Sequence, residues 1–542
     1  MHMTNIARIL SNPVVAKVEN ISDKAKLALS DAMSFIVEGH EHMGAGDWDG
    51  KSSLFDWTSG KFPAGFIPTA EAVLQKQGYE VQNLRKPLPQ PLGPMPTPDV
   101  PIVDNFPADP ARAYQFKTVR ILEKRGNMVA RVATGGGKSR IAALCITRIG
   151  RKTAFVTTRQ VLLYQMGEAL EEASKRILET LSDDTLLKMM GAAIAPKLKA
   201  HKISYVGDSV WDTSGDVVLA MVQTLADRLA PFEADSYKTA SENEVARQRW
   251  KRRHDEVRAF CDEVEFLIAE EAHEAGGQSY YEVCKAMKKA YYRLALTATP
   301  MMRDGESNVR LVAMFGPIRI QVTEKQLIDA GILARPVFKF VKTQMPRTLR
   351  RTTAWQKAED LGIVTNTWRN KYACAETIRA ARFGLSTLIL VKRQRHGKIV
   401  HEMLKQCGLR GVYIFGNTSK EKRQDALRRL ASGDYDYVIG STILDVGVDV
   451  PSIGLLIILG GGKAEVQHRQ RIGRALRRKT AMPNFAFIVD FDDPLNKHLI
   501  KHSKQRRAIV ESTEGFAENV LGRKEDFNFT GLGFTPRMKK AA

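Results

Sequence analysis

The chain has 542 residues, so it indicates about two to four domains rather than a single hydrophobic core. Its 82 Lys and Arg residues against 60 Asp and Glu residues give a formal net charge of +22, which favours a polyanionic partner such as nucleic acid. With no apolar run of about eighteen residues or more and no secretory signal pattern, we expect a soluble, intracellular protein without a membrane partner. The five cysteines lie far apart and form no CxxC pair, which argues against a zinc site or a disulfide framework.

A proline-rich stretch, RKPLPQPLGPMPTPDVP at residues 85–101, marks the first domain boundary. Prolines at every second or third position exclude a helix or a central strand, so the stretch predicts an extended, fairly stiff linker over residues 86–110. Residues 1–85 are therefore expected to form a separate small N-terminal domain.

After the linker, strand-like apolar runs alternate with helical patterns in two groups of about five strands each. Continuous Val, Ile and Leu runs between helices predict parallel sheets that are buried on both faces. The predicted fold class is therefore α/β, with two tandem domains at residues 111–330 and 331–500. A C-terminal helix and a basic tail are expected over residues 501–542. The charged segment at residues 242–263 predicts a solvated helix inside the first α/β domain.

A glycine-rich turn, ATGGGKS at residues 133–139, follows the predicted strand NMVARV and opens the predicted helix SRIAALCITRI. Glycines let backbone N–H groups surround phosphates, and the helix N-terminus adds positive potential. Lys138 is expected to reach the β- and γ-phosphates of a nucleotide, and Ser139 to hold Mg²⁺. The match is to the short form GxGK[ST]. Its phosphate-binding turn comprises Thr134, Gly135, Gly136 and Gly137.

Two adjacent glutamates, Glu270 and Glu271, end the apolar run FLIA. A nucleoside triphosphatase needs one carboxylate for the Mg²⁺ shell and a second that orients and deprotonates the attacking water. We assign Glu270 to the metal and Glu271 to the water. A buried strand brings both residues to the carboxyl edge of the sheet, where the phosphate-binding turn also emerges.

Three segments resemble motifs of superfamily 2 helicases. EEAH, which begins at Glu270, resembles the DEAH box, and LTATP at residues 296–300 resembles motif III. RAYQFKTV at residues 112–119 resembles the upstream segment whose glutamine, here Gln115, reads the adenine. The resemblance implies two RecA-like domains that use ATP and Mg²⁺.

The second α/β domain carries two further resemblances to this family. STILDVGVDVP at residues 441–451 resembles motif V, and GGGKAEVQHRQRIGRALRR at residues 460–478 resembles motif VI. Motif V implies positions near the nucleotide, and motif VI implies a catalytic glutamine and two arginines that cross the cleft to stabilise charge on the γ-phosphate. These positions are Gly447, Asp449, Gln470, Arg474 and Arg477.

One position departs from the family pattern, because Glu270 stands where an Asp is usual. The extra methylene is expected to displace the metal-bound water and to slow turnover rather than abolish it. A natural variant is favoured over a degenerate ATPase, since the other motifs are intact.

The N-terminal segment at residues 46–81, which begins GDWDGKSSLFDW, resembles the small domain before the motor in phage UvsW-type recombination helicases and their XPB-like relatives. This resemblance implies an α+β domain that grips duplex DNA, and 3′ to 5′ ATP-driven translocation in a bacterial or phage-infected cytoplasm. It also implies remodelling of forks, Holliday junctions, and R- or D-loops in recombination, repair or replication restart, with single-stranded, duplex and branched DNA as partners. Recombination or single-strand-binding proteins are further expected partners.

Loops along one face of two such domains are expected to follow DNA phosphates without reading bases. The motor candidates are Arg159, Gln223, Thr224, Arg303, Lys392 and Arg393. In the N-terminal domain the candidates are Trp48 and Lys51, with Trp57, although tryptophans in a small domain are more often core residues.

The preferred function is a DNA-dependent ATPase and helicase. An RNA helicase shares the same motor and is distinguished by stimulation with RNA. The motor subunit of a restriction or repair assembly is distinguished by association with a nuclease, since the sequence has no recognisable nuclease motif. The alternative of a non-hydrolysing DNA-binding scaffold is supported only by the unusual Glu270.

Overall fold

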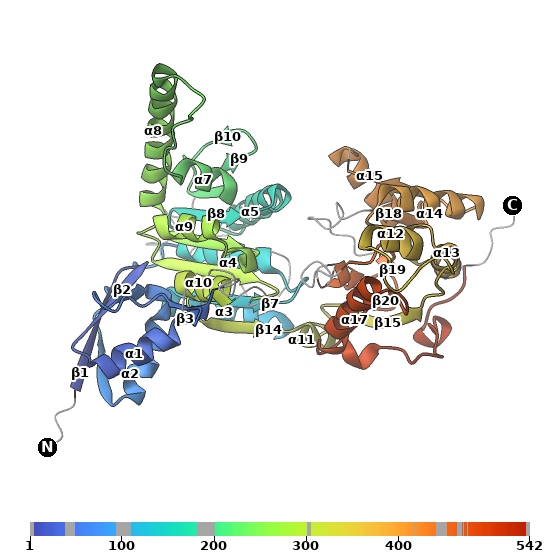
Figure 1. Cartoon of the computed structure of the whole chain (residues 1–542), viewed down its shortest axis with the longest axis horizontal. Coiled ribbons are helices and arrows are strands. Elements are labelled where there is room, and N and C mark those ends of the chain that lie inside the picture. Colours follow the sequence, from blue (N-terminus) through green and yellow to red (C-terminus); the bar gives the residue numbers. More distant parts are fainter. Residues whose placement is uncertain are drawn as a thin grey trace. The chain divides into compact units, whose positions relative to one another are not determined.

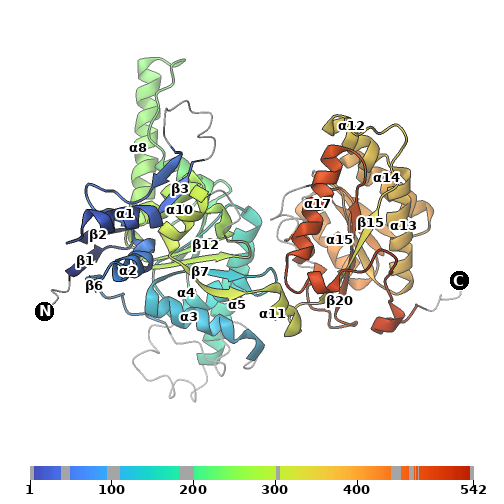
Figure 2. The same ribbon diagram turned by 60° about the horizontal axis from the view of Figure 1, so that its bottom comes forward.

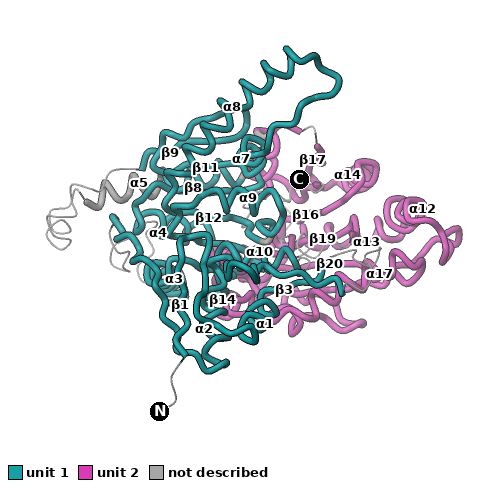
Figure 3. Tube along the Cα trace, turned by 60° about the vertical axis from the view of Figure 1, so that its left-hand side comes forward, with its two compact units in different colours: residues 1–132, 137–321 teal, residues 133–136, 322–542 magenta. Residues whose placement is uncertain are grey.

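A computed structural model gives the structure of the chain as two compact units. They comprise residues 1–132 with 137–321 (unit 1), and residues 133–136 with 322–542 (unit 2) (Figure 3). The residues that the structure describes are 5–37, 49–93, 110–181, 201–300, 305–416, 418–440, 453–462, 469, 471–473 and 475–537. The division falls between residues 321 and 322, so α11 (Glu324–Asp329), expected in the first α/β domain, lies in unit 2.

Unit 1 begins with a small α+β module that forms its own four-stranded sheet, in the order β5-β2-β1-β6. Ala7 and Ile9 of the first strand are buried, whereas Ile6 and Leu10 are exposed, as the period of two along a strand requires. Strand β1 is antiparallel to β2 and parallel to β6. The elements of the module are β1 (Asn5–Ser11), β2 (Val15–Glu19), α1 (Asp23–Ala32), β3 (Ser34–Ile36), β4 (Lys51–Ser53), β5 (Lys61–Pro63), α2 (Ile67–Lys76) and β6 (Tyr79–Asn83).

This module packs directly on a helix of the following α/β domain, α10 (Gly305–Phe315). A Cβ at Gly65 would lie 2.0 Å from the carbonyl oxygen of Val312, so only glycine allows this approach of two backbones. Ile9 and Leu74 of the module belong to the same buried cluster as Leu311 of α10. The module and the α/β domain therefore share one hydrophobic core.

The described start of the proline-rich linker is bound to the surface of unit 1. The backbone N–H of Leu92 donates to the carbonyl oxygen of Ile149 at 3.0 Å, and that of Gly93 donates to Arg148 at 3.1 Å. The Tyr292 hydroxyl donates to the carbonyl oxygen of Pro89 at 2.6 Å. Residues 84–93 form no helix or strand and lie against the domain through these hydrogen bonds.

The α/β domain of unit 1 is built on an eight-stranded sheet in the order β10-β9-β11-β8-β12-β13-β7-β14 (Figure 1). Every residue of β8, β12 and β13 is buried, so the sheet is covered on both faces. Strand β13 pairs in parallel with both β12 and β7, which brings the carboxyl ends of all three to one edge. The strands are β7 (Asn127–Val132), β8 (Thr153–Thr157), β9 (Ile203–Gly207), β10 (Val210–Trp211), β11 (Val217–Met221), β12 (Phe266–Glu270), β13 (Tyr292–Thr297) and β14 (Ile318–Val322).

One helix of this domain extends beyond the sheet. The predicted charged helix is confirmed as α8 (Ala240–Glu263), whose N-terminus is closed by a capping box between Thr239 and Glu242. Figures 1 and 2 show its N-terminal half projecting away from the body of unit 1. The other helices of the domain are α3 (Ala113–Arg125), α4 (Lys138–Ile149), α5 (Gln160–Leu181), α7 (Val222–Leu229) and α9 (Gln278–Ala286).

Unit 2 contains a six-stranded sheet in the order β15-β20-β19-β16-β18-β17, and all its pairs are parallel. The two tandem parallel-sheet domains of RecA-like type predicted from the sequence are thus present. The elements are β15 (Arg335–Lys342), α12 (Trp355–Glu359), α13 (Thr367–Arg382), β16 (Ser386–Leu390), α14 (Gln394–Gln406), β17 (Gly411–Ile414), α15 (Lys420–Ser432), β18 (Tyr437–Gly440), β19 (Ile453–Ile458), β20 (Phe485–Asp492) and α17 (Lys497–Glu511).

The segment after α17 packs on unit 2 up to residue 537, whereas the rest of the expected basic tail, residues 538–542, lies outside the described residues. Phe527, Phe529 and Phe534 are buried in the core of unit 2, where their rings lie 4.7 to 5.6 Å from that of Phe487 in β20. The backbone N–H of Arg537 donates to the carbonyl oxygen of Arg382 at 2.7 Å. Residues 512–537 are therefore an integral part of unit 2, because burial of three aromatic side chains stabilises their packing.

The five cysteines are unpaired, and all except Cys407 are buried. Within the described ranges, no helix combines the length and the apolar character that crossing a bilayer requires.

Candidate functional site

The glycine-rich turn after β7 has the backbone conformation that its sequence predicts. Gly135 and Gly137 have φ angles of 88° and 82°, in the left-handed region that L side chains rarely adopt. Helix α4 begins directly afterwards, at Lys138, so its first free N–H groups face the turn. A Cβ at Gly137 would lie 2.7 Å from Nε2 of Gln115, which is only 2% exposed. The turn and the glutamine predicted to read adenine are thus adjacent.

Glu270 is the last residue of β12, and its carboxylate is buried within unit 1. Burial raises the pKa of Glu270 to about 8, which the positive charge of Lys138 opposes and the Glu271 carboxylate reinforces. Its Oε2 atom has no hydrogen-bond partner in the described part of the chain. A buried carboxylate oxygen without a partner, beside the lysine of a phosphate-binding turn, is a suitable ligand for a cation.

Glu271 is held in a strained backbone conformation. Its φ and ψ angles are 50° and 46°, in the left-handed helical region, and the residue is 9% exposed. This conformation costs a residue with a Cβ roughly 1–2 kcal/mol. It ends β12 abruptly and starts a short 3₁₀ turn at Ala272.

Neighbouring elements fix the position of this turn. The Tyr280 hydroxyl on α9 lies 2.9 Å from the carbonyl oxygen of Val156 and 3.4 Å from that of Glu270. Glu274 accepts a hydrogen bond from the Thr158 hydroxyl and lies 3.8 Å from the guanidinium of Arg159. The sequence motifs predicted neither Tyr280 nor Glu274. Only the position of Glu274 within EEAHE pointed to it, and nothing in the sequence indicated Tyr280.

The segment that resembles motif III continues the same edge of the sheet. Thr297 is fully buried at the end of β13, and its hydroxyl accepts a hydrogen bond from the backbone N–H of Thr299 at 3.2 Å. Buried Arg293 of the same strand donates to three carbonyl oxygens at the C-terminal end of α9. Strand β13 therefore links the motif III turn to the helix that follows the two glutamates.

The site residues predicted in motifs V and VI are only partly described. Arg477 lies in unit 2 and forms an antiparallel backbone bridge with Leu333, and the N–H of Ala334 donates to the carbonyl oxygen of Leu476 at 2.7 Å. Four predicted residues lie outside the described residues: Gly447, Asp449, Gln470 and Arg474.

Several of the predicted nucleic-acid contacts form ion pairs within their own units. Lys392 and Arg393 lie 3.2 Å and 2.5 Å from the carboxylate of Glu359, which is only 2% exposed. Lys51 lies 2.6 Å from Asp31. In each pair the cation is about half exposed, so it keeps a face for a phosphate.

The remaining predicted nucleic-acid contacts are at least partly exposed or lie outside the described residues. Gln223 is exposed and Thr224 is half-buried, both in the first turn of α7. Trp57 is 43% exposed and is not a core residue. Arg303 and Trp48 lie outside the described residues.

The residues of unit 1 fit a divalent cation held together with a triphosphate. Ser139 in the first turn of α4 and Glu270 at the end of β12 supply a hydroxyl and a carboxylate. Among the described residues, no three His, Cys, Asp or Glu side chains converge on one point. A site with few protein ligands therefore fits Mg²⁺, which usually keeps several waters and substrate phosphates in its shell.

A parallel sheet with a phosphate-binding turn after one strand and paired acids after another defines a P-loop nucleoside triphosphatase, here with two RecA-like domains. Two family models match the chain. The one described as type III restriction enzyme, res subunit, matches residues 109–302, and the helicase conserved C-terminal domain matches residues 370–479. The chain therefore carries the two domains of a superfamily 2 helicase.

Individual relatives share low sequence identity with this chain, over part of its length. The ATP-dependent DNA helicase uvsW of Enterobacteria phage T4 is 24% identical over 219 residues, which cover 39% of this chain and 43% of that protein. The DNA 3′-5′ translocase XPB2 of Sulfurisphaera tokodaii is 26% identical over 246 residues, which cover 39% of this chain and 56% of that protein. The chain thus spans about half the length of these relatives. The crystal structure of T4 UvsW aligns over 95% of this chain and 98% of that one, with 16% identity and a TM-score of 0.39.

Proposed function

We propose that the chain is an ATP-dependent DNA translocase and helicase that remodels branched DNA, such as forks and Holliday junctions, with 3′ to 5′ polarity. The observation that carries the catalytic part is the buried Glu270–Glu271 pair at the edge of the sheet that also carries Lys138. Support for DNA as the substrate comes from the net charge of +22 and from the two relatives, which are named as a DNA helicase and a DNA translocase.

Individual residues of unit 1 have separate roles in the proposed ATP hydrolysis. The helix N-terminus at Lys138 and the lysine itself hold the phosphates, and Gln115 orients the adenine. Ser139 and Glu270 would hold Mg²⁺, which would supply positive charge to the triphosphate. Glu271 accepts a proton from the attacking water.

Motif VI contributes the remaining charge. The positively charged side chains of Arg474 and Arg477 stabilise the charge that develops on the γ-phosphate. In this proposal Gln470 also takes part in catalysis, and the motif V residues Gly447 and Asp449 bind the nucleotide.

The test is a steady-state ATPase assay with no nucleic acid, single-stranded DNA, duplex DNA, a four-way junction and RNA, all at one salt concentration. We expect the largest stimulation with the junction. Lys138→Ala should remove hydrolysis while DNA binding persists, and the matched control is Lys124→Ala, an exposed lysine at the end of α3. Stimulation by RNA alone would replace this proposal with an RNA helicase, and normal hydrolysis by Lys138→Ala would remove the phosphate-binding turn from the mechanism.

A second candidate function is supported by the family model over residues 109–302, which carries the name of a restriction-enzyme subunit. In that case the chain would be the motor of a multisubunit nuclease. Stable co-purification with a nuclease subunit, together with ATP-dependent cleavage of duplex DNA, would favour this function over branch remodelling.

A further inference from the structure

Helix α8 carries a concentrated group of cations that the motor does not use. Six of its basic residues are exposed, and none of them forms an ion pair with another described residue: Arg247, Arg249, Lys251, Arg252, Arg253 and Arg258. The helix is attached to the domain through its last turns, where Val257, Phe260 and Cys261 are buried. Arg247, Arg249 and Lys251 lie on the projecting half, whereas Arg252, Arg253 and Arg258 lie on the half that is attached to the domain.

Four residues of α8 follow one another at helical spacing on one face. Arg247, Lys251, His254 and Arg258 are separated by four, three and four residues, which places them in one row. We call this row the basic stripe. The rise per residue makes it about 16 Å long, which is the axial length of roughly five base pairs of duplex DNA.

Acidic neighbours do not neutralise the stripe. Glu256 lies 2.6 Å from Arg228 of α7, and Glu242 accepts from the backbone N–H of Thr239 in the capping box. Glu244 accepts a hydrogen bond from Gln248 at 3.3 Å. Asp255 follows Lys251 by four residues, but no ion pair joins them.

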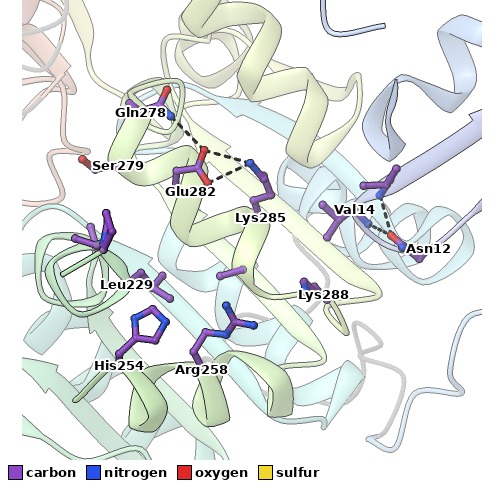
Figure 4. Close-up of a pocket in the computed structure, with 15 residues that line it drawn as sticks. Asn12, Val14, Leu229, His254, Arg258, Gln278, Ser279, Glu282, Lys285 and Lys288 are labelled. Carbon is purple, nitrogen blue, oxygen red and sulfur yellow. Dashed lines mark hydrogen bonds and ion pairs between the residues drawn. The ribbon is translucent and has the colours of Figure 1, made fainter. Parts of the chain in front are cut away.

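The stripe leads into a pocket of about 600 Å³ at the base of α8, formed together with α7, α9 and the turn between β1 and β2 (Figure 4). His254, Arg258, Lys285 and Lys288 line it, and Glu282 is its acidic residue. Glu282 lies 3.2 Å from Lys285 and accepts a hydrogen bond from Gln278. Arg258 and Lys288 are both exposed and have no ion-pair partner among the described residues, so the pocket carries an excess of positive charge.

Local packing orients His254 toward this pocket. Its ring stacks on Trp250 with a centroid distance of 4.8 Å, and its Nδ1 lies 3.0 Å from the carbonyl oxygen of Arg228. Because a carbonyl oxygen only accepts, Nδ1 must carry the proton of this bond. Trp250 donates to the carbonyl oxygen of Ala230 at 2.9 Å, so its ring is held in place and is not free for base stacking.

We propose that the basic stripe and the pocket at its base form a binding track for the phosphate backbone of duplex DNA, separate from the motor's own DNA path. This inference rests on the proposed function and deepens it. A straight helix with cations in one row matches the regular phosphate spacing of a duplex strand. The stripe offers no free aromatic ring, which single-strand binding sites typically supply. The pocket would hold the phosphates nearest the N-terminal module, with Asn12 of the β1–β2 turn at its rim.

The test compares two triple variants of the full chain. The stripe variant is Arg247→Gln, Lys251→Gln and Arg258→Gln, and the control is Arg249→Gln, Arg252→Gln and Arg253→Gln on the other side of α8. Both remove three charges and keep good helix formers. Affinity for a fluorescent 25-base-pair duplex is measured at several salt concentrations, with single-stranded DNA of equal length as a second arm. Circular dichroism verifies that α8 is intact.

We expect the stripe variant to reduce the slope of log K against log salt by about one for each lost phosphate contact, and the control by much less. Duplex affinity should fall roughly tenfold or more, and single-strand affinity by less. Equal losses of duplex affinity in both variants would show a general effect of positive charge and would overturn the proposal that the basic stripe binds DNA. If the wild type binds DNA and hydrolyses ATP, but the stripe variant keeps its slope, this inference alone fails. If the wild type does neither, the proposed function fails as well.

Discussion

The guanidinium of Arg159 lies 3.8 Å from the carboxylate of Glu274, and each side chain is about one fifth exposed. Arg159 follows β8 and is a predicted DNA contact, whereas Glu274 belongs to the turn that Glu271 begins. The pair therefore joins a surface expected to bind phosphates to the turn that carries the proposed catalytic base.

Glu274→Gln should lower the stimulation of ATP hydrolysis by DNA by roughly two- to fivefold, since a partly buried ion pair is worth about 0.5–1 kcal/mol. The effect should exceed any change in the rate without DNA. The measurement is the ratio of the two rates, and Glu306→Gln, which removes the similarly exposed ion pair with Arg310, is the control. An equal change of this ratio in both variants would show that the Arg159–Glu274 ion pair has no specific role in the response to DNA.

Glu270→Asp should hydrolyse ATP at the same rate as the wild type or faster, because the shorter side chain restores the usual geometry of the metal shell. Single-turnover hydrolysis at saturating Mg²⁺ measures this rate. A collapse of activity would show that Glu270 does not occupy the metal position.

Glu271→Gln and Glu271→Gly should both lose roughly 10²- to 10⁴-fold in the rate of hydrolysis, as expected for removal of a general base. They should differ in stability. The φ angle of 50° at this position is strained for glutamine and free for glycine, so the glycine variant should be more stable by about 0.5–1 kcal/mol. Urea unfolding of the two variants tests this, and a more stable glutamine variant would contradict the strain at Glu271.

The stability of the nucleotide-free protein should depend on pH through Glu270. Its pKa is about 8 in the folded protein against the ordinary 4.5, so between these values the folded state binds more protons than the unfolded state. The free energy of unfolding should then fall as the pH rises from about 5 to 8, by up to about 1.4 kcal/mol per unit, and level off above that range. Glu270→Gln should remove this component, and parallel pH profiles for the two proteins would contradict it.

Phe529→Ala should destabilise unit 2 by about 3–5 kcal/mol, because it leaves a cavity in the core. The ring of Phe529 lies 4.7 Å from that of Phe487 and 5.0 Å from that of Phe383. Phe415→Ala is the control, since Phe415 is 37% exposed in the same unit, and its loss should cost much less. Thermal unfolding followed by calorimetry distinguishes the two outcomes.

The catalytic half of the site could be predicted because its chemistry is local in the sequence. The turn through Gly135 and Gly137 and the acids at Glu270 and Glu271 each need particular residues in consecutive positions. In the structure both glycines have positive φ angles and both acids are buried, while their catalytic roles stay predictions. The helix at residues 240–263 could also be predicted, since its caps and charges are local features.

Features that depend on contacts distant in sequence were not predictable in this way. The packing of Phe527 and Phe529 against β20, and the pairing of Lys392 and Arg393 with Glu359, join residues that only the tertiary fold brings together. The left-handed conformation of Glu271 was equally hidden, because glutamate does not favour it and the surrounding sheet imposes it.

The aromatic segment at residues 527–534 has a consequence for how unit 2 is made during protein synthesis. The apolar face around Phe487 of β20 and Phe383 after α13 emerges from the ribosome before the side chains that cover it. Unit 1 can close its own core earlier, whereas unit 2 must wait with an uncovered aromatic surface, which is the kind of surface that chaperones bind and that promotes aggregation. Slowing translation beyond residue 511 should therefore prolong this exposed intermediate and lower the yield of native protein.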